Sequence, residues 1–262
     1  MIDIVFENDS LLIANKPSGL VVNNSVTTSG ETLQNEISRY LKLSEGDLGV
    51  GERAGIVHRL DRETSGLIII AKTKKVFENL QGQFEAREVN KTYIALVHGN
   101  IAHDEGVINL PIARIGKFGK FGISKGGRDS ETRYKVEKRL VFNDTKFKDL
   151  LTNEELGLTK VRRKYLKQQS IRYSLLSIFP KTGRTHQIRV HLKSLGNPIV
   201  SDLIYEPAKL LKFDFLWCTR LFLHAAEIEF KDPKTKKILK FGADLPNELK
   251  EALRYLTIGP EQ

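Results

Sequence analysis

GIVHRLDRETSGLIIIAK, residues 55–72, places a polar, charged loop between two apolar segments. The pattern predicts an amphipathic strand at 55–60 and a buried strand at 67–71. The loop sets Asp61 among basic side chains, and Arg59 and Arg62 favour the ionised form of its carboxyl group. Such a carboxylate can act as a nucleophile or a base. A loop held together by surface ion pairs explains the same residues equally well, so the motif alone leaves both interpretations open.

A second polar cluster, FPKTGRTHQIRVHLKSLGNP at residues 179–198, combines a tight turn with a short helix. Thr185 can cap the helix, and Ile188 and Leu192 recur at helical spacing before the stop signals Gly196 and Pro198. A helix start of this kind suits an anion, either a phosphate or a carboxylate. The side chains presented there are Arg184, Thr185, His186 and Arg189.

The rest of the chain alternates short apolar runs with amphipathic segments and predicts an α+β fold. Helical spacing marks residues 33–41, 76–84 and 249–256, whereas HDEGV at 103–107 is interpreted as a loop. Further strands are predicted at 3–7, 11–15, 92–98, 174–179, 223–230 and 237–241. Because strands outnumber helices and tight turns join neighbouring strands, we expect a mixed, largely antiparallel sheet with flanking helices. Tyr93 falls in a predicted strand, where it would by itself be interpreted as a core aromatic.

The positive charge of the chain is concentrated in one region. The net charge is +10, and residues 113–193 carry 21 Lys and Arg against 7 Asp and Glu. Such a field attracts polyanions, so nucleic acid is the leading partner and an anionic membrane surface the alternative; a solvated charged face has the same composition. Residues 117–135 are predicted to form an exposed basic hairpin, and about 141–170 an inserted element. The exposed cations of the insertion are Arg162, Arg163, Lys164 and Lys167.

Several classes of site are excluded. The single cysteine, Cys218, can form neither an internal disulfide nor a CxxC pair, which fits a reducing compartment. His186 and His191 lie about 140° apart on a helix, unlike the i, i+4 pair of a zinc site, so we expect no metal. Ser124 in GISKG has the spacing of a hydrolase nucleophile elbow, but a Gly/Lys-rich loop surrounds it. Without a signal pattern or a long apolar run, a cytoplasmic protein is expected.

Taken together and in this order, the segments resemble the RluA-type family of pseudouridine synthases. The matching pieces are IANKPSGLVV (13–22), GIVHRLDRETSGLIIIAK (55–72), KTYIALVHG (91–99), SETRYKV (130–136), PKTGRTHQIRVHLKSLGNPIVSDLIY (180–205) and RLFLHAAEIEF (220–230). The chain departs from the pattern at Ser201, where the family commonly has glycine. The resemblance implies the pseudouridine synthase fold in a single catalytic domain over residues 1–262, with the basic insertion at about 141–170 and no N-terminal RNA-binding domain.

The resemblance implies a role for each matching residue. Asp61 corresponds to the catalytic aspartate of the HRLD motif, Tyr93 to the active-site tyrosine of the KTY motif, and Arg189 to the arginine of HQIR that pairs with the aspartate. Arg59 would help to displace the target base from its stack. We assign the remaining RNA contacts to Arg62, Thr64, Arg184, Thr185, His186, Arg162, Arg163, Lys164 and Lys167.

The expected activity is the isomerisation of specific uridines in structured RNA to pseudouridine through an aspartate nucleophile. This reaction involves no net redox change and requires no nicotinamide, metal or ATP, and attack at ribose C1′ or at the base both remain open. We expect ribosomal RNA as the substrate, with transfer RNA the alternative, no DNA or membrane partner, and a monomer. A non-catalytic RNA-binding or RNA-chaperone protein would share the basic field without requiring Asp61, Tyr93 and Arg189 together. A hydrolase built on Ser124 is the weaker alternative.

Overall fold

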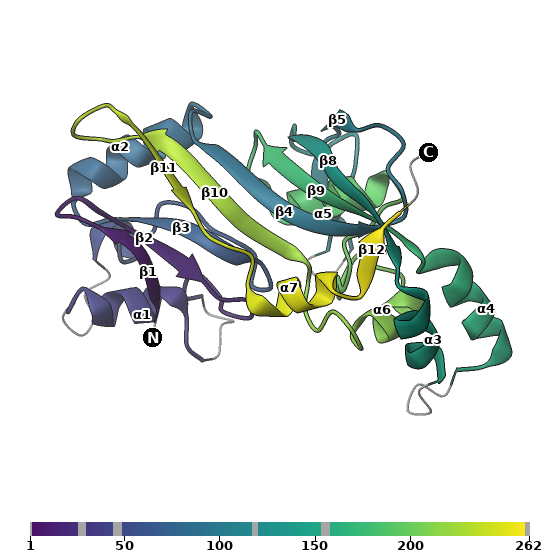
Figure 1. Cartoon of the computed structure of the whole chain (residues 1–262). Helices are drawn as coiled ribbons and strands as arrows, with labels where there is room; N and C mark the ends of the chain where they lie inside the picture. Colours follow the sequence, from purple (N-terminus) through teal and green to yellow (C-terminus); the bar gives the residue numbers. More distant parts are fainter. Residues whose placement is uncertain (1, 26–29, 44–48, 117–119, 153–157, 260–262) are drawn as a thin grey trace. The chain divides into compact units, whose positions relative to one another are not determined.

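The computed structural model describes residues 2–25, 30–43, 49–116, 120–152 and 158–259 (Figure 1). The chain divides into two compact units. The first unit combines residues 1–92 with 224–244, and the second combines 93–223 with 245–262. The single catalytic domain that the sequence analysis expects over residues 1–262 remains a prediction. Within the described ranges, no helix is both long enough and apolar enough to cross a membrane.

The first unit contains strands that pair in the order β1-β2-β3-β10-β11. Neighbouring strands are antiparallel except β3 and β10, which are parallel. The strands are β1 (Asp3–Glu7), β2 (Leu11–Lys16), β3 (Ser65–Ala71), β10 (Leu223–Lys231) and β11 (Ile238–Gly242). Two helices, α1 (Leu33–Tyr40) and α2 (Lys74–Glu85), and the single turn η1 (Val50–Glu52) complete the unit.

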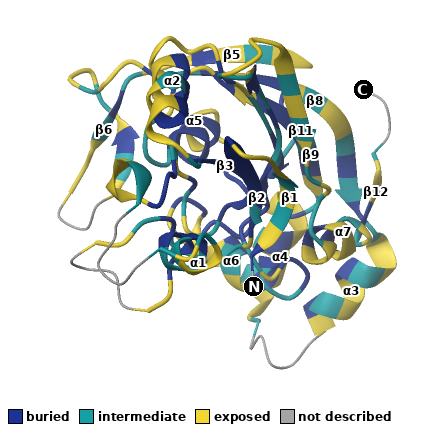
Figure 2. Cartoon of the chain, turned by 90° about the vertical axis from the view of Figure 1, so that its left-hand side faces the viewer, coloured by how far each residue is buried: buried dark blue, intermediate teal, exposed yellow. Residues whose placement is uncertain are grey.

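The core of the first unit forms around β3. Every residue of this strand is buried, as the continuous apolar run predicts for a strand covered on both faces, and β2 and β3 are dark blue in Figure 2. Helix α2 begins after its N-cap Thr73 and places Val76, Phe77 and Leu80 in the cluster that contains Leu67. Burying side chains of this size stabilises the fold by about 1.5–3 kcal/mol each, which holds the loop before β3 in place.

The second unit contains an antiparallel sheet in the order β4-β9-β8-β12, with β5 also paired to β8, and a separate hairpin of β6 and β7. Its strands are β4 (Asn90–His98), which starts in the first unit, β5 (Glu105–Asn109), β6 (Ile112–Arg114), β7 (Phe121–Ile123), β8 (Glu131–Phe142), β9 (Arg172–Pro180) and β12 (Leu256–Ile258). Its helices are α3 (Asp144–Thr152), α4 (Lys160–Gln169), α5 (Gln187–Ser194), α6 (Ala208–Asp214) and α7 (Asn247–Leu253).

An aromatic cluster fills the second unit beside α3 and α6. Phe142 lies 5.2 Å from both Phe147 and Trp217, measured between ring centroids, and 5.7 Å from Phe213. Tyr173 packs edge-on against Trp217 at 5.3 Å. Aromatic rings in such tilted arrangements dominate core energetics, and here they hold the inserted helix α3 to the sheet.

The structure confirms the predicted α+β class with a largely antiparallel sheet, and it corrects three elements. The helix predicted at 249–256 ends at Leu253, and Leu256 lies in β12, where it pairs with Phe142 of β8. Residues 55–60 are not a strand: they make one isolated bridge, between Ile56 and Ile70. The reason is local, because Gly55 has a φ of 81° and Nε2 of His58 accepts the hydrogen bond of the Ile69 N–H group. Burial, helped by the nearby Lys91 charge, lowers the pKa of His58 to about 3 and keeps that nitrogen an acceptor.

The third correction concerns HDEGV, which is not entirely a loop. Its last residues, from Glu105, enter β5, where the long strand β8 offers an edge that pairs Glu105 with Lys135. The predicted basic hairpin at 117–135 spans β7 and the start of β8, and residues 117–119 lie outside the described ranges. The insertion at about 141–170 includes helices α3 and α4.

Candidate active site

The loop that carries Asp61 enters β3 in the first unit. Leu60 and Thr64 are buried, with 4% and 2% of their surfaces exposed, whereas Asp61 is half-buried. The Thr64 N–H donates to the carbonyl oxygen of Asp61 at 3.1 Å, which closes a tight turn. Gly66 has a φ of 121°, and a Cβ there would lie 2.2 Å from the carbonyl oxygen of Ala225. The loop is therefore fixed at both ends. Thr64, which was predicted to contact RNA, is buried.

Lys16, at the end of β2, anchors the Asp61 loop, a role that the sequence reasoning missed. Its side chain is fully buried, and its ammonium group donates to the carbonyl oxygens of Pro17, Leu20 and Arg62 at 2.8, 2.9 and 3.0 Å. The Gly19 N–H donates to the same Arg62 oxygen at 2.9 Å. A buried ammonium is tolerated only when it is hydrogen-bonded, and this one ties the 16–20 turn to the Asp61 loop. A lysine between an apolar strand and a Pro-Ser-Gly turn was the available signal.

The two arginines that flank Asp61 in sequence are both exposed. Nε of Arg62 lies 3.2 Å from a Glu63 carboxylate oxygen, so part of the positive charge expected beside Asp61 is taken up by Glu63. The pair is solvent-exposed on the Arg62 side, where such pairs contribute about 0–1 kcal/mol. Arg59 presents its guanidinium at the surface, as a contact to RNA requires.

The other two predicted catalytic residues belong to the second unit. Tyr93 lies in β4 opposite Ile178 of β9, with 9% of its surface exposed. Arg189 lies in α5 with 3% exposed. The predicted catalytic set therefore divides between the two units, with Asp61 in the first and the tyrosine and arginine in the second.

The start of α5 differs from the prediction. The N-cap is His186, in the left-handed region with φ 56° and without a side-chain cap, so the prediction that Thr185 caps the helix is wrong. The buried side chain of Gln187 holds the turn instead. Its Oε1 accepts hydrogen bonds from the Thr182 hydroxyl at 2.7 Å and from the Arg184 N–H at 3.0 Å. A buried amide that accepts from two donors thus fixes the turn before the helix, while no side chain caps the helix itself.

Arg189 forms a buried, bidentate ion pair with Asp202. Nε and Nη2 of the arginine donate to Oδ2 and Oδ1 of Asp202 at 2.8 and 2.7 Å, and Asp202 is fully buried. The adjoining Ser201, where the family commonly has glycine, takes the left-handed φ of 60°, and its hydroxyl donates to the carbonyl oxygen of Cys218 at 2.5 Å. The turn therefore accommodates serine, with a side-chain hydrogen bond that glycine could not make.

Tyr205 joins the helix start to the β6–β7 hairpin. Its Oη lies 2.8 Å from Nδ1 of His186 and accepts a hydrogen bond from the Phe121 N–H at 3.1 Å. Three cations lie within about 6 Å of its ring centroid: Arg189 at 5.1 Å, Lys193 at 5.8 Å and Lys120 at 5.9 Å. Sequence reasoning gave this tyrosine no role, yet it links the start of α5, with the predicted RNA contact His186, to the β6–β7 hairpin.

The four basic residues of the insertion lie on helix α4, where one of them bonds to α6 and three are exposed. The Thr159 hydroxyl caps the helix by accepting from the Arg162 N–H at 3.2 Å. Nη2 of Arg162 lies 3.4 and 3.3 Å from the carbonyl oxygens of Ala208 and Lys209, so this guanidinium tethers α4 to α6. The other cations are exposed and, with Lys160, follow the i, i+3, i+4, i+7 spacing of one helix face: Arg163, Lys164 and Lys167.

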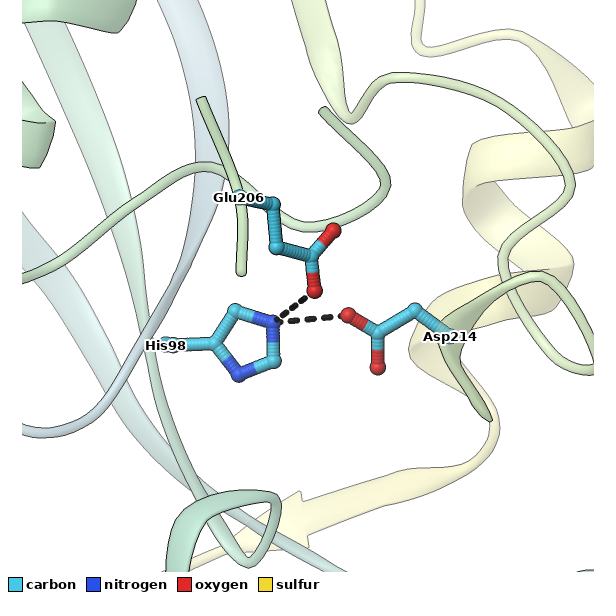
Figure 3. A group of neighbouring side chains, drawn as sticks. All are labelled: His98, Glu206 and Asp214. Carbon is cyan, nitrogen blue, oxygen red and sulfur yellow. Dashed lines mark hydrogen bonds and ion pairs between the residues drawn. The ribbon is translucent and has the colours of Figure 1, made fainter. Parts of the chain in front are cut away.

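One group of described residues has ligands spaced closely enough to suggest a metal site: His98, Glu206 and Asp214 (Figure 3). Nε2 of His98 lies 3.0 Å from Glu206 Oε1 and 2.7 Å from Asp214 Oδ2, which are hydrogen-bond distances. Ligand atoms around a tetrahedral zinc ion are separated by about 3.3 Å. Moreover, Nδ1 of His98 has no partner within the described ranges, whereas a metal-bound histidine normally donates from its second nitrogen. The residues therefore do not fit a metal ion.

Two members of this buried triad, His98 and Glu206, have raised pKa values and therefore retain protons. Burial opposes a charge on His98, but the Asp214 and Glu206 carboxylates prevail and raise its pKa to about 10. Burial and the neighbouring Asp214 also raise the pKa of Glu206, to about 9. The triad fastens the segment before α6, and α6 itself, to β4.

Comparison with known proteins places these features in a family. The profile described as RNA pseudouridylate synthase matches residues 10–194. The chain is 35% identical over 260 residues to the ribosomal large subunit pseudouridine synthase C of Buchnera aphidicola, covering 97% of this chain and 70% of that protein. It is 35% identical over 236 residues to the dual-specificity RNA pseudouridine synthase RluA of Vibrio cholerae, covering 89% and 79%.

A solved structure shares the fold. The human RNA pseudouridylate synthase domain containing 1 protein superposes with a TM-score of 0.67 and 23% identity, covering 94% of this chain and 84% of that one. At this identity the likeness concerns the fold alone, and it agrees with the α+β architecture of the two units.

Proposed function

The chain belongs to the RluA-type family of RNA pseudouridylate synthases, and on that premise we propose that it converts uridines of ribosomal RNA to pseudouridine with Asp61 as the nucleophile. The observation that carries the proposal is the Asp61 loop itself. Buried Leu60, Thr64 and Lys16 fix its backbone, while the carboxylate-bearing residue stays half-buried. A side chain that meets an RNA base needs this combination of a fixed backbone and an accessible carboxylate.

In the proposed reaction, the Asp61 carboxylate attacks the uridine at ribose C1′ or at the base, and the N1–C1′ bond breaks. The detached uracil turns, a C5–C1′ bond forms, and the bond between Asp61 and the substrate breaks, which regenerates the free carboxylate. The C5 proton is then removed and N1 gains a proton, so that the product is an isomer of the substrate. Tyr93, a buried ring in β4, stacks against the base and assists this proton transfer.

Arg189 is proposed to hold the Asp61 carboxylate in its reactive position. A guanidinium carries five N–H groups, and the bonds to Asp202 engage only Nε and Nη2. An arginine beside a carboxylate favours its ionised form, which is the form that acts as a nucleophile.

RNA binding is proposed to come mainly from the second unit. Residues 113–193 hold 21 of the 42 Lys and Arg residues, and the exposed face of α4 adds Arg163, Lys164 and Lys167. Contacts to phosphate supply most of the affinity of such a field. Moving a base out of its stack costs a few kcal/mol, and exposed Arg59 is proposed to take part in displacing it.

The preference for ribosomal RNA is supported by the name of the Buchnera relative, which acts on the large ribosomal subunit. The test is to map pseudouridine across total RNA from cells with and without the gene, and from cells complemented with the wild type or with Asp61→Asn. We expect one or more ribosomal sites to disappear and to return only with the wild type. Loss confined to transfer RNA would overturn the ribosomal assignment, and unchanged maps would favour the non-catalytic RNA-binding alternative.

A further inference from the structure

The β6–β7 hairpin of the second unit is a separate two-stranded sheet, and among the described strands it shares no ladder with the larger sheet. A two-stranded hairpin is at best marginally stable by itself in water, so its position depends on what it packs against. Here it packs against α5: Ile112 forms a small buried cluster with Val190 and Tyr205, and Phe121 lies against the same cluster. The attachment of the hairpin to α5 therefore depends on a small set of side chains.

The hydroxyl group of Tyr205 adds a polar attachment at the start of β7. Phe121, the first residue of this strand, donates its N–H to Tyr205 Oη at 3.1 Å, and the same oxygen lies 2.8 Å from Nδ1 of His186. The ring of His186 meets the rings of Phe121 and Tyr205 edge-on, at centroid distances of 5.7 and 5.5 Å. A single oxygen atom therefore joins β7 to the N-cap residue of α5.

The backbone of His186 gives an independent sign that this junction is built for a purpose. Its φ of 56° and ψ of 19° place it in the left-handed region, which is uncommon for any residue other than glycine. A strained conformation persists only where the surrounding structure holds it, and such residues cluster at binding and catalytic sites. The contacts of the His186 ring with Tyr205 and Phe121 are part of what holds it here.

Both sides of the junction carry exposed cations. Arg114 and Lys120 belong to the hairpin and Lys193 to α5, and all three are exposed. The ammonium groups of Lys120 and Lys193 lie 5.9 and 5.8 Å from the centroid of the Tyr205 ring, so each of the two elements places a positive charge at this ring. Like charges held near one another repel, and an RNA backbone, with its closely spaced phosphates, offers a counter-charge to both.

We propose that Tyr205 is a positioning residue for RNA binding, whose hydroxyl group fixes β7 against the start of α5 so that the cations of both elements meet one RNA backbone as a single surface. This inference rests on the proposed function. A surface whose parts are fixed before binding loses less conformational freedom when the RNA arrives, and its affinity is higher for that reason. The ring of Tyr205 would fill the buried cluster equally well as phenylalanine, whereas only the hydroxyl oxygen can accept the Phe121 hydrogen bond.

The first test is Tyr205→Phe, which removes the oxygen atom and keeps the ring with its packing. The probe is an unmodified transcript of large-subunit ribosomal RNA, and its affinity at fixed salt is compared with the single-turnover rate at saturating RNA. We expect the affinity to fall by about 3- to 10-fold, as for one lost hydrogen bond, and the rate at saturation by less than about 2-fold. In the free protein, hydrogen exchange of the Phe121 amide should become faster, because its acceptor is gone. Unchanged exchange or unchanged affinity would overturn the inference.

A double-mutant cycle on RNA affinity separates positioning from a general loss of structure. Its other member is the double substitution Arg114→Gln with Lys120→Gln, which removes cations that the docked hairpin presents. If Tyr205 acts by placing these charges, Tyr205→Phe should cost little further affinity in that background. Losses that multiply would mean that the hydroxyl group acts on binding in some other way, and they too overturn the inference.

Tyr173→Phe is the matched control, because Tyr173 is a fully buried tyrosine of the same unit whose hydroxyl donates to the carbonyl oxygen of Ser170 at 3.2 Å. We expect this control to lower the melting temperature while RNA affinity and exchange of the Phe121 amide stay as in the wild type. A control that weakens RNA binding as much as Tyr205→Phe would contradict a specific role for Tyr205.

The wild-type protein distinguishes a failure of this inference from a failure of the proposed function. If it binds the transcript and forms pseudouridine while Tyr205→Phe binds equally well, only the role of Tyr205 is lost. If it binds the transcript without forming pseudouridine, the proposed activity fails, and the affinity cycle still decides the role of Tyr205. A wild type that does not bind the transcript overturns both.

Discussion

Replacing Lys16 by methionine tests the anchor of the Asp61 loop. Methionine keeps an apolar stem of similar length but cannot donate a hydrogen bond. The Arg62 carbonyl oxygen retains its bond from the Gly19 N–H, whereas those of Pro17 and Leu20 lose the ammonium group. The variant therefore removes the charge-assisted tie between the 16–20 turn and the Asp61 loop, and leaves the surrounding apolar packing largely in place.

The expected magnitude follows from the two acceptors that lose their donor. A fully buried acceptor without a partner costs about 1–3 kcal/mol; because both bonds are only partly buried and Pro17 is exposed, water replaces part of what is lost, and the total loss in the free energy of unfolding should be about 1–3 kcal/mol. Because burying methionine is less costly than burying an ammonium group, the loss should lie in the lower half of this range. The single-turnover rate should fall as well, since the loop that carries Asp61 loses a fixed contact.

The assay combines urea denaturation with hydrogen exchange of peptides that cover residues 59–64. Lys74→Met is the matched control, since the Lys74 side chain is 86% exposed and pairs only loosely with Glu78, at 4.0 Å. The control should change the free energy of unfolding by less than about 0.5 kcal/mol. If Lys16→Met is as stable as this control and exchange in the loop is unchanged, the ammonium group does not hold the loop and the reasoning is refuted.

Two further perturbations test the second unit. Replacing Arg163, Lys164 and Lys167 by glutamine should lower the slope of log affinity against log salt by up to about 0.7–0.9 per lost phosphate contact, with single-turnover rates at saturating RNA preserved. Neutralising the three exposed lysines in 234–237 is the control, and equal slopes for the two variants would count against an RNA-binding face on α4. For Glu206→Gln, the raised pKa of about 9 means that the folded protein keeps a proton that the unfolded carboxyl releases near 4.5, so wild-type stability falls as pH rises between these values. Urea unfolding at several pH values should show that the free energy of unfolding of the variant rises relative to that of the wild type as pH increases. If the difference between the two proteins is the same at every pH, Glu206 is not protonated in the folded protein.

The elements that sequence reasoning predicted well are those with strong local patterns. The apolar run at 67–71 became β3, and the helical spacing around Leu80 became α2. The segment at 55–60 was misassigned because its alternation resembles a strand, while Gly55 has a positive φ and His58 uses its ring to bond β3. Neither feature is visible in hydrophobic periodicity, since both depend on what the neighbouring strand offers.

The candidate site shows the same division between local and tertiary information. The motifs predict Asp61 and Arg189 as catalytic residues, because these residue types carry chemistry at recognisable spacing. They did not reveal the contacts of Lys16 and Asp202, which are made with three carbonyl oxygens and with a guanidinium that only the fold brings near. Charge alone grouped Arg162 with the exposed cations, whereas in the structure its guanidinium donates to carbonyl oxygens of α6.

The measurement that tests the central claim most directly is the single-turnover formation of pseudouridine by Asp61→Asn in purified form. Asparagine keeps the size and hydrogen-bonding capacity of the side chain but removes the nucleophilic charge. Glu63→Gln is the control, because it neutralises another half-buried carboxylate of the same loop. We predict that Asp61→Asn forms no pseudouridine while its RNA affinity stays within a few-fold of the wild type, and that the control turns over. Wild-type turnover by Asp61→Asn would contradict the assignment of Asp61 as the nucleophile.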